Sequence, residues 1–249
     1  MESVKTFYDQ FASKFHLVFD DWDKVISEQS QTISTLIQKI TPKTEISLWD
    51  CTCGVGTQIL WLAQLGYSMT GTDMSSFSIQ RAKQEAKKRG LEIFFESHDI
   101  RVPYNTPNYF DGVISFDNSL PHIIDIWELK TSLQNIFSRL KQGGFFIGSI
   151  RDYDKILENR ESFTLPSQVG NNIFFQMWEW EDTDIYSMSS FLLEQQTKGY
   201  EVFTQKTKYR AYTRQVFSEL FSEVWFSSIR WIFPEESGYH QPILVAFKK

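Results

Sequence analysis

The sequence predicts an α/β fold: a Rossmann-like, seven-stranded, mostly parallel sheet with helices on both faces, and a small antiparallel β cap inserted after strand five. Two observations predict the sheet. An apolar run ends at Asp50 and precedes a glycine turn and a helical apolar pattern, and a second apolar run ends at Asp73. A third observation predicts the cap, because aromatic and β-branched runs separated by turn sequences fill residues 172–210.

The individual elements follow from hydrophobic period and from the residues that begin and end helices. Short apolar runs indicate buried strands, whereas apolar residues three and four apart, between a serine or aspartate and a glycine, indicate helices. The expected core strands are residues 46–50, 67–72, 91–96, 110–116 and 145–150, with a closing antiparallel pair at 227–233 and 242–247. The expected helices are residues 57–65, 75–90, 125–140 and 214–221, and the expected cap strands are residues 172–180, 185–195 and 200–210.

These elements divide the chain into three parts. Residues 1–151 form the core with an N-terminal helical segment, residues 152–211 form the cap, and residues 212–249 add the last helix and the closing strands. The cap leaves the sheet at the carboxyl edge, where open α/β sheets bind ligands, which favours a cover over a substrate. A surface meander or a dimer contact is the alternative interpretation.

The composition argues against several classes of protein. The 249 residues carry a net charge of −6, whereas a nucleic-acid binder needs a cationic surface. No apolar run approaches the roughly 18 residues of a membrane span, and the N-terminus carries acids and lacks the basic-then-apolar order of a signal peptide. We therefore expect a cytoplasmic protein, a monomer or homodimer, that binds neither nucleic acid nor a membrane.

Cys51 and Cys53 lie on either side of one residue in the first turn. This spacing suits a disulfide badly, and a structural zinc site needs four ligands. The four histidines are scattered singly along the chain, so no second pair of ligands is present at the required spacing. We expect two small, buried turn residues and no metal.

The turn at residues 50–57 contains Gly54 and Gly56, which let a backbone approach a ligand closely. Ile59 replaces the third glycine of the nicotinamide fingerprint, and no Gly-Lys-Ser/Thr follows, so a P-loop is excluded. What remains is a strand-ending acid, the Gly-x-Gly turn, the acid Asp73 after the second strand, and His-Asp-Ile at 98–100.

This set of motifs resembles the class I S-adenosylmethionine (SAM) methyltransferases. The resemblance implies that the glycine turn faces the methionine part of the cofactor, that Asp73 binds the ribose hydroxyls and that Asp99 lies beside the adenine. It also implies an N-terminal segment that folds over the cofactor. The implied cofactor-binding residues are Tyr8, Trp22, Asp50, Thr52, Gly54, Gly56, Thr57, Asp73, Met74, His98, Asp99, Ile100, Phe116 and His122.

Two stretches, FDNSLPHI at 116–123 and IRDYDKIL at 150–157, resemble the glycine and sarcosine N-methyltransferases more narrowly. The resemblance implies that Arg151 grips a substrate carboxylate, as a guanidinium fork does, and that Asn118 lies at the substrate amine. Arg151 could instead pair with the neighbouring acids, and His122 could cap the next helix. The candidate catalytic residues are Asn118, His122, Arg151 and Tyr153.

The expected activity is methyl transfer from SAM to a small molecule, most simply to the amine of an amino-acid-like substrate similar to glycine or sarcosine. Phe174 and Phe175 stand where that family has paired tyrosines, and the family's N-terminal arginine for the cofactor carboxylate has no clear match. The apolar, tyrosine-poor cap keeps a small-molecule O-methyltransferase open, with His122 as a base. A SAM-binding regulator without turnover is the third alternative.

Overall fold

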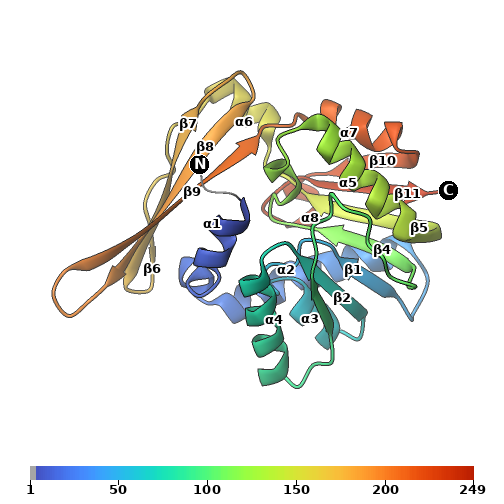
Figure 1. Ribbon diagram of the computed structural model, residues 1–249, viewed down its shortest axis with the longest axis horizontal. Helices are drawn as coiled ribbons and strands as arrows, with labels where there is room; N and C mark the ends of the chain where they lie inside the picture. Colours follow the sequence, from blue (N-terminus) through green and yellow to red (C-terminus); the bar gives the residue numbers. More distant parts are fainter. Residues whose placement is uncertain (1–3) are drawn as a thin grey trace.

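The computed structural model describes residues 4–249 and has two sheets (Figure 1). The larger has seven strands in the order β10-β11-β5-β4-β1-β2-β3. The pairs from β3 through β5 are parallel, and β11 and β10 are antiparallel to their neighbours. The strands are β1 (Ser47–Asp50), β2 (Ser68–Asp73), β3 (Phe94–Ser97), β4 (Phe110–Ser115), β5 (Leu140–Ser149), β10 (Phe226–Ile232) and β11 (Ile243–Lys248). The predicted Rossmann-like fold class is confirmed.

Alternation along the strands divides the hydrophobic core into two clusters, one on each face of the sheet. Trp49 and Val113 pack with the apolar faces of α5 and α7, whereas Leu48 and Ile114 pack with those of α2, α3 and α4. The helices of these two layers are α5 (Ile126–Arg139) and α7 (Arg214–Glu223), then α2 (Trp22–Ile40), α3 (Ile59–Gln64) and α4 (Ser76–Lys88).

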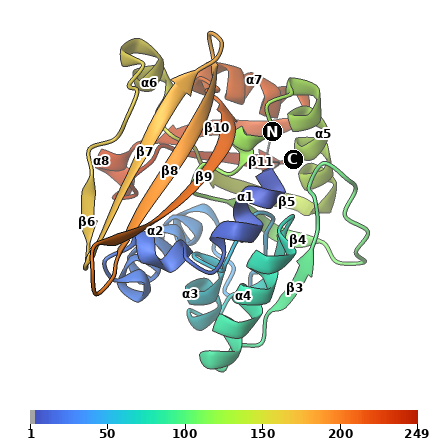
Figure 2. The same cartoon turned by 60° about the vertical axis from the view of Figure 1, so that its left-hand side comes forward.

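The second sheet is the cap, with four strands in the order β6-β7-β8-β9 (Figure 2). Strands β7 (Asn172–Trp180), β8 (Ile185–Gln195) and β9 (Tyr200–Arg210) lie where the sequence predicts them. Two elements of this region were not predicted, the short edge strand β6 (Ser167–Val169) and α6 (Tyr153–Asn159). The inward faces of β8 and β9 join the same hydrophobic cluster as α5 and α7.

The N-terminal helix α1 (Val4–Phe11) lies between the cap and the core, in contact with β9 and α4 (Figure 1). Phe7 and Phe11 are buried in this position. The chain continues through the 3₁₀ helix η1 (Phe15–Val18) into α2. Two further short elements are the 3₁₀ helix η2 (Leu120–His122), which follows β4, and α8 (Pro234–Ser237), which precedes β11.

Boundary differences from the expectation are small. β3 begins at Phe94 rather than at residue 91, and β5 begins at Leu140, directly after α5, rather than at residue 145. The pairing register of β4 with β5 shifts between Phe110 and Gly112, and the added residues include Gly143 at a φ of +74°. Among residues 4–249, no helix is both long and apolar enough to cross a membrane.

Candidate active site

A cavity of about 600 Å³ lies at the carboxyl ends of β1, β2 and β4, and α1 and the inner face of the cap cover it. Its lining combines the core turns with aromatic residues of α1 and polar residues of the cap. Of the residues predicted for the site, the structure brings these to the cavity wall: Tyr8, Thr52, Gly54, Thr57, Asp73, Met74, His98, Asp99, Ile100, Phe116, His122 and Arg151.

The glycine turn presents backbone to this cavity. Gly54 has a φ of +52°, and a Cβ added there would meet nothing within 4 Å, so the backbone faces open space. Gly56, at a φ of +102°, does not line the cavity, and a Cβ there would lie 2.9 Å from Leu60. Gly54 therefore permits close approach of a ligand, whereas Gly56 permits the packing of α3 against the turn.

Asp73 lies at the end of β2, next to this turn. Its two carboxylate oxygens accept backbone N–H groups from Gly54 at 2.9 Å and from Ser75 at 2.8 Å. Burial raises the pKa of Asp73 to about 6, although both hydrogen bonds favour the charged form. Each oxygen keeps a free lone pair, so the carboxylate can also accept hydroxyl groups from a ligand.

Two polar residues, His98 and Asp99, follow the carboxyl end of β3. Nε2 of His98 is buried without a hydrogen-bond partner, and burial lowers the pKa of this ring. The carboxylate of Asp99 is held by the guanidinium of Arg101, with Nη2 to Oδ2 at 2.7 Å. His98 therefore lines the cavity with a buried, unpartnered ring nitrogen, while the Asp99 carboxylate already binds Arg101.

Asp50 is buried beneath the turn and does not line the cavity, whereas the buried residues Cys51 and Cys53 do line it. Oδ1 of Asp50 accepts the Thr52 N–H at 3.3 Å, whereas Oδ2 has no partner, and burial raises the pKa of this carboxyl. Cys51 and Cys53 are 1% and 2% exposed, and burial raises the pKa of both thiols. The expectation of two buried turn residues is confirmed for the cysteines.

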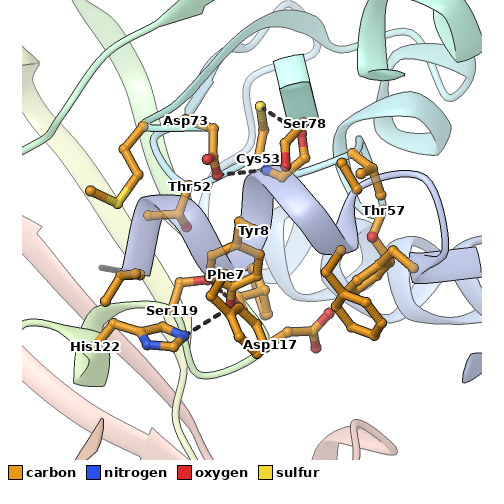
Figure 3. A pocket seen from close by; sticks show the side chains of 18 of the residues that line it. Phe7, Tyr8, Thr52, Cys53, Thr57, Asp73, Ser78, Asp117, Ser119 and His122 are labelled. Carbon is orange, nitrogen blue, oxygen red and sulfur yellow. Dashed lines mark hydrogen bonds between the residues drawn. The ribbon is translucent and has the colours of Figure 1, made fainter. Parts of the chain in front are cut away.

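His122 and Tyr8 face each other at the opening between α1 and η2 (Figure 3). Nε2 of His122 is 2.8 Å from the Tyr8 hydroxyl, and Nδ1 is 3.1 Å from the Lys208 carbonyl oxygen. This carbonyl can only accept, so Nδ1 carries the proton and Nε2 accepts from Tyr8. Burial, aided by the charge of Arg151, lowers the pKa of His122 to about 3. Asp125, rather than His122, caps the next helix.

Arg151 projects from the end of β5 into a ring of cap residues. Its guanidinium carbon lies 4.8 Å from the ring centre of Trp178 and 5.1 Å from that of Tyr209. Nη1 donates to the Tyr186 hydroxyl at 2.8 Å, and Nη2 donates to the Gln176 side-chain oxygen at 3.3 Å. Aromatic faces and neutral oxygens therefore hold this cation in a fixed plane.

The alternative ion pair of Arg151 with its neighbouring acids is wrong. Asp152 and Asp154 both bind Arg214 of α7. No carboxylate of residues 4–249 lies within ion-pair distance of Arg151. Asn118 and Tyr153 are buried behind it and do not line the cavity. The Asn118 side chain accepts the Arg151 backbone N–H at 3.0 Å and donates to the Tyr153 hydroxyl at 2.8 Å.

Trp22 also lies away from the cavity, contrary to the prediction. It begins α2, and the Arg89 guanidinium lies 5.3 Å from its ring centre. Phe174 lines the cavity, whereas Phe175 stacks on Phe191 with ring centres 4.9 Å apart, on the opposite face of the cap. Successive residues of a strand point to opposite faces, so one of the two phenylalanines points away from the site.

Several residues of the site were missed by sequence reasoning. The description of the cap as poor in tyrosine is wrong, because Tyr186 and Tyr209 surround Arg151. The strand alternation of β8 and β9 could have placed both residues on one face, but it could not show that this face meets β5. The other missed lining residues include Asp117, Gln176, Met188, Ser190 and His240.

Comparison with known proteins agrees with this geometry. A family model described as a methyltransferase domain matches residues 49–144. Glycine N-methyltransferase from Homo sapiens is 30% identical over 141 residues, which are 51% of this chain and 46% of that protein. Glycine/sarcosine N-methyltransferase from Halorhodospira halochloris is 23% identical over 190 residues, 70% of this chain and 71% of that protein. The chain thus spans about half the length of the glycine N-methyltransferases that it matches.

The fold is shared with solved methyltransferase structures. A SAM-dependent methyltransferase from Clostridium acetobutylicum has a TM-score of 0.77 at 19% identity, over 96% of this chain and 97% of that one. A SAM-bound amino pentose methyltransferase from Micromonospora echinaspora has a TM-score of 0.75 at 13% identity, with the same coverage. The chain therefore contains a stretch, residues 49–144, that matches a methyltransferase domain, and it shares the fold of these solved methyltransferases.

Proposed function

We propose that this protein transfers a methyl group from SAM to the amine of a small molecule that also carries a carboxylate, an amino-acid-like substrate. The observation that carries the proposal is Arg151. It lines the cavity, is always charged, and has no carboxylate partner among residues 4–249. A partly buried cation that lines a cavity and has no carboxylate partner in the described chain favours an anionic ligand.

The surroundings of Arg151 suit the carboxylate of such a substrate. Trp178 and Tyr209 cover the two faces of the guanidinium, so a new partner approaches in the plane of its N–H groups. Asn118 fixes the backbone of Arg151 from behind. The cap and core residues together hold the fork in one orientation, which reduces the ordering cost of gripping a carboxylate.

The residues at the turn fit the cofactor. Gly54 exposes backbone to open space, and Asp73 presents a buried carboxylate with unused lone pairs to the same region. Nε2 of His98 adds an unpartnered polar atom beyond Asp73. These groups support a ligand with a hydroxylated ribose over β2 and a polar ring over β3.

SAM supplies a methyl group on a sulfonium, which is already a good leaving group, so the protein has mainly to position the acceptor. Arg151 would hold the carboxylate end of the acceptor and Asn118 would fix Arg151. Phe7, Phe11 and the cap would exclude water from the cavity and so favour the neutral, nucleophilic form of the amine.

The geometry favours an amine over a phenol or carboxylate as the acceptor. Those acceptors would use His122 as a base, but the pKa of His122 is about 3 and its Nε2 already accepts from Tyr8. A base with this pKa removes a proton poorly near neutral pH. The names of the glycine and sarcosine relatives also support an amino-acid amine. One of the structurally similar proteins is an amino pentose methyltransferase, so an amino sugar is the competing acceptor that the test should include.

The test compares acceptors with and without a carboxylate. Wild-type protein and the Arg151→Lys and Arg151→Ala variants are assayed with sarcosine, with its decarboxylated analogue dimethylamine and with an amino sugar. We expect wild type to prefer sarcosine. We expect Arg151→Ala to lose about 100-fold or more in kcat/KM for sarcosine, because it removes hydrogen bonds between two charged groups. The kcat/KM of Arg151→Lys for sarcosine should lie between those of wild type and Arg151→Ala, because an ammonium keeps the charge but lacks the planar fork.

Arg214→Ala is the matched control, because Arg214 is a cap-side arginine that binds only Asp152 and Asp154 in the ion pairs of the described chain. It should lower stability without changing the preference for a carboxylate. Equal use of sarcosine and dimethylamine by wild type, or a preference for the amino sugar, would refute the amino-acid-like substrate. Cofactor binding without turnover of any acceptor would favour a SAM-binding regulator.

A further inference from the structure

Asp117 lies just beyond the end of β4 and lines the cavity in an unusual backbone conformation. Asp117 and Asn118 have φ angles of +54° and +65°, so two consecutive non-glycine residues are left-handed. Ser149 holds both, because its Oγ accepts the Asp117 N–H at 3.0 Å and its carbonyl accepts the Asn118 N–H at 3.2 Å. Such conformations cost free energy and concentrate at functional sites.

The Asp117 carboxylate has only neutral partners. Oδ2 accepts from the side-chain amide of Gln58 at 2.7 Å, and Oδ1 accepts the Tyr239 hydroxyl at 2.6 Å. Nε2 of His240 lies 3.5 Å from Oδ1, but burial lowers the pKa of this imidazole, so it is uncharged at neutral pH. No lysine or arginine of residues 4–249 forms an ion pair with Asp117, and the carboxylate retains capacity to accept further donors.

Sheet order places Asp117 at one particular end of the cavity. The strands run β4, β1, β2, β3, with Asp99 and Asp73 following β3 and β2. Asp117 follows β4, on the other side of the glycine turn, and Figure 3 shows it across the Phe7 and Tyr8 rings from Asp73. A cofactor whose adenosine lies over β2 and β3 therefore extends its amino-acid end toward Asp117.

Two arginines are among the described residues that line the cavity. Arg101 pairs with Asp99 at the β3 end. Arg151 follows β5 and donates to Tyr186 of the cap, and its charge acts on His240, which lies beside Asp117. Around Asp117 the lining side chains are neutral amides, those of Gln29, Gln58 and Gln241. An ammonium is therefore favoured beside the Asp117 carboxylate, which has no lysine or arginine of residues 4–249 as an ion-pair partner.

Building on the proposed function, we infer that Asp117 binds the α-ammonium of the amino-acid end of SAM, and that the protein recognises this end through its ammonium rather than its carboxylate. In this left-handed turn the Asp117 side chain meets Gln58 and Tyr239. Tyr239 and Gln58 hold it there, so the carboxylate is ordered before the ligand binds.

Calorimetric titration with three ligands tests the assignment. S-adenosylhomocysteine carries both charged groups, its decarboxylated analogue keeps only the amine, and 5′-methylthioadenosine carries neither. In wild type, loss of the carboxylate should weaken binding less than about threefold, whereas loss of both groups should weaken it about tenfold or more. Asp117→Asn should weaken the first two ligands about tenfold and leave 5′-methylthioadenosine unchanged.

Control variants separate this role from folding and from the rest of the cofactor site. Asp117→Gly removes the carboxylate while suiting the left-handed backbone, and it should reproduce Asp117→Asn. Asp73→Asn should weaken all three ligands, and Asp125→Asn, at the cap of α5 and away from the cavity, should weaken none.

The outcomes distinguish this inference from the proposed function. If wild type binds none of the three ligands, the proposed cofactor site itself fails. If wild type binds them but loss of the carboxylate alone costs as much as loss of both groups, recognition through the ammonium is refuted. The same holds if the Asp117 variants alter acceptor KM while leaving all three affinities intact, because Asp117 would then serve the acceptor.

Discussion

At the scale of single residues, the buried imidazole of His122 links stability to pH. The folded state keeps this ring neutral with a pKa of about 3, whereas the unfolded chain has the ordinary value of 6.5. Below pH 6.5 the unfolded state therefore binds more protons, and stability is lost as the pH falls. Between pH 7 and pH 5 we expect His122 to remove about 2 kcal/mol of unfolding free energy.

Urea unfolding at both pH values measures this loss in wild type and in His122→Asn, whose amide can still donate to the Lys208 carbonyl oxygen. The variant should be less stable at pH 7, yet it should lose about 2 kcal/mol less on going to pH 5. Every other titrating group is common to both proteins. An identical pH dependence in the two would show that His122 does not titrate in this range.

Asp73 predicts a pH dependence for ligand binding. Its pKa is raised to about 6, so the free protein protonates this carboxyl as the pH falls below 6. Ribose hydroxyls donate best to the charged form, and protonation therefore competes with binding. We expect the affinity for S-adenosylhomocysteine to fall about tenfold between pH 7.5 and pH 5, and Asp73→Asn to bind weakly at both.

Calorimetric titration at the two pH values checks this expectation. The folded variant must bind less tightly than wild type at pH 7.5 and show little further change at pH 5. A wild-type affinity that is the same at both values would remove Asp73 as the acceptor of ligand hydroxyls.

The sequence predicted the residues of this site best where the ends of two neighbouring strands and the turn between them identify the residues. Gly54 and Asp73 belong to a local strand-turn pattern, and the structure brings them together through a direct hydrogen bond. The partners of Arg151 are different. Tyr186 and Tyr209 arrive from distant strands, so no local spacing indicates them, and only the packing of the cap on β5 shows why Arg151 avoids its neighbouring acids.

At the scale of elements, α1 contacts the start of α4, next to Asp73. Oδ1 of Asp9 accepts the Ser75 hydroxyl at 2.6 Å, and Ser75 donates its own backbone N–H to Asp73. Asp9→Ala removes this contact but leaves the buried Phe7 and Phe11. We expect the contact between α1 and the core to lose about 1 kcal/mol of free energy. S-adenosylhomocysteine should then dissociate about fivefold faster, and amide exchange in α1 should be faster.

Stopped-flow dissociation and hydrogen exchange check this prediction. Lys5→Ala is the control, because it deletes an ion pair of Asp9 on the exposed side of the same helix and should change both rates less than twofold. Equal effects of the two variants would mean that the Asp9–Ser75 contact does not hold α1 on the core.

The ends of helices and strands were predicted well where an uninterrupted hydrophobic pattern fills the whole element. The three long cap strands have aromatic runs between clear turn sequences, and their bounds match the prediction. β5 begins earlier than expected because Leu140 pairs with Phe110 before the register shift, although Gly143 and Gly144 read as the end of a helix. α6 was missed because its N-cap residue Asp152 makes no side-chain capping hydrogen bond, and Asp154 of its first turn binds Arg214, which is distant in the chain.

At the scale of the whole molecule, the core and the cap are separate segments of the chain, but their side chains pack into a shared hydrophobic cluster. Trp178, Tyr186 and Tyr209 of the cap share one hydrophobic cluster with Tyr153 and with the helices that cover the main sheet. Arg214 of α7 adds ion pairs to Asp152 and Asp154 at the base of the cap. A cap built on the shared cluster cannot open to water without exposing the core.

The last prediction is therefore that core and cap unfold together. Native-state hydrogen exchange in increasing urea should give peptides from β8 and from β4 the same free energy of opening, because neither sheet keeps its apolar face covered alone. Tyr186→Ala should lower both values by the same amount, about 3 kcal/mol for a large buried side chain. Exchange of β8 at a clearly lower free energy than β4, or a loss confined to β8 in the variant, would mean that the cap is an independent unit, and the shared cluster would then reflect contact without cooperativity.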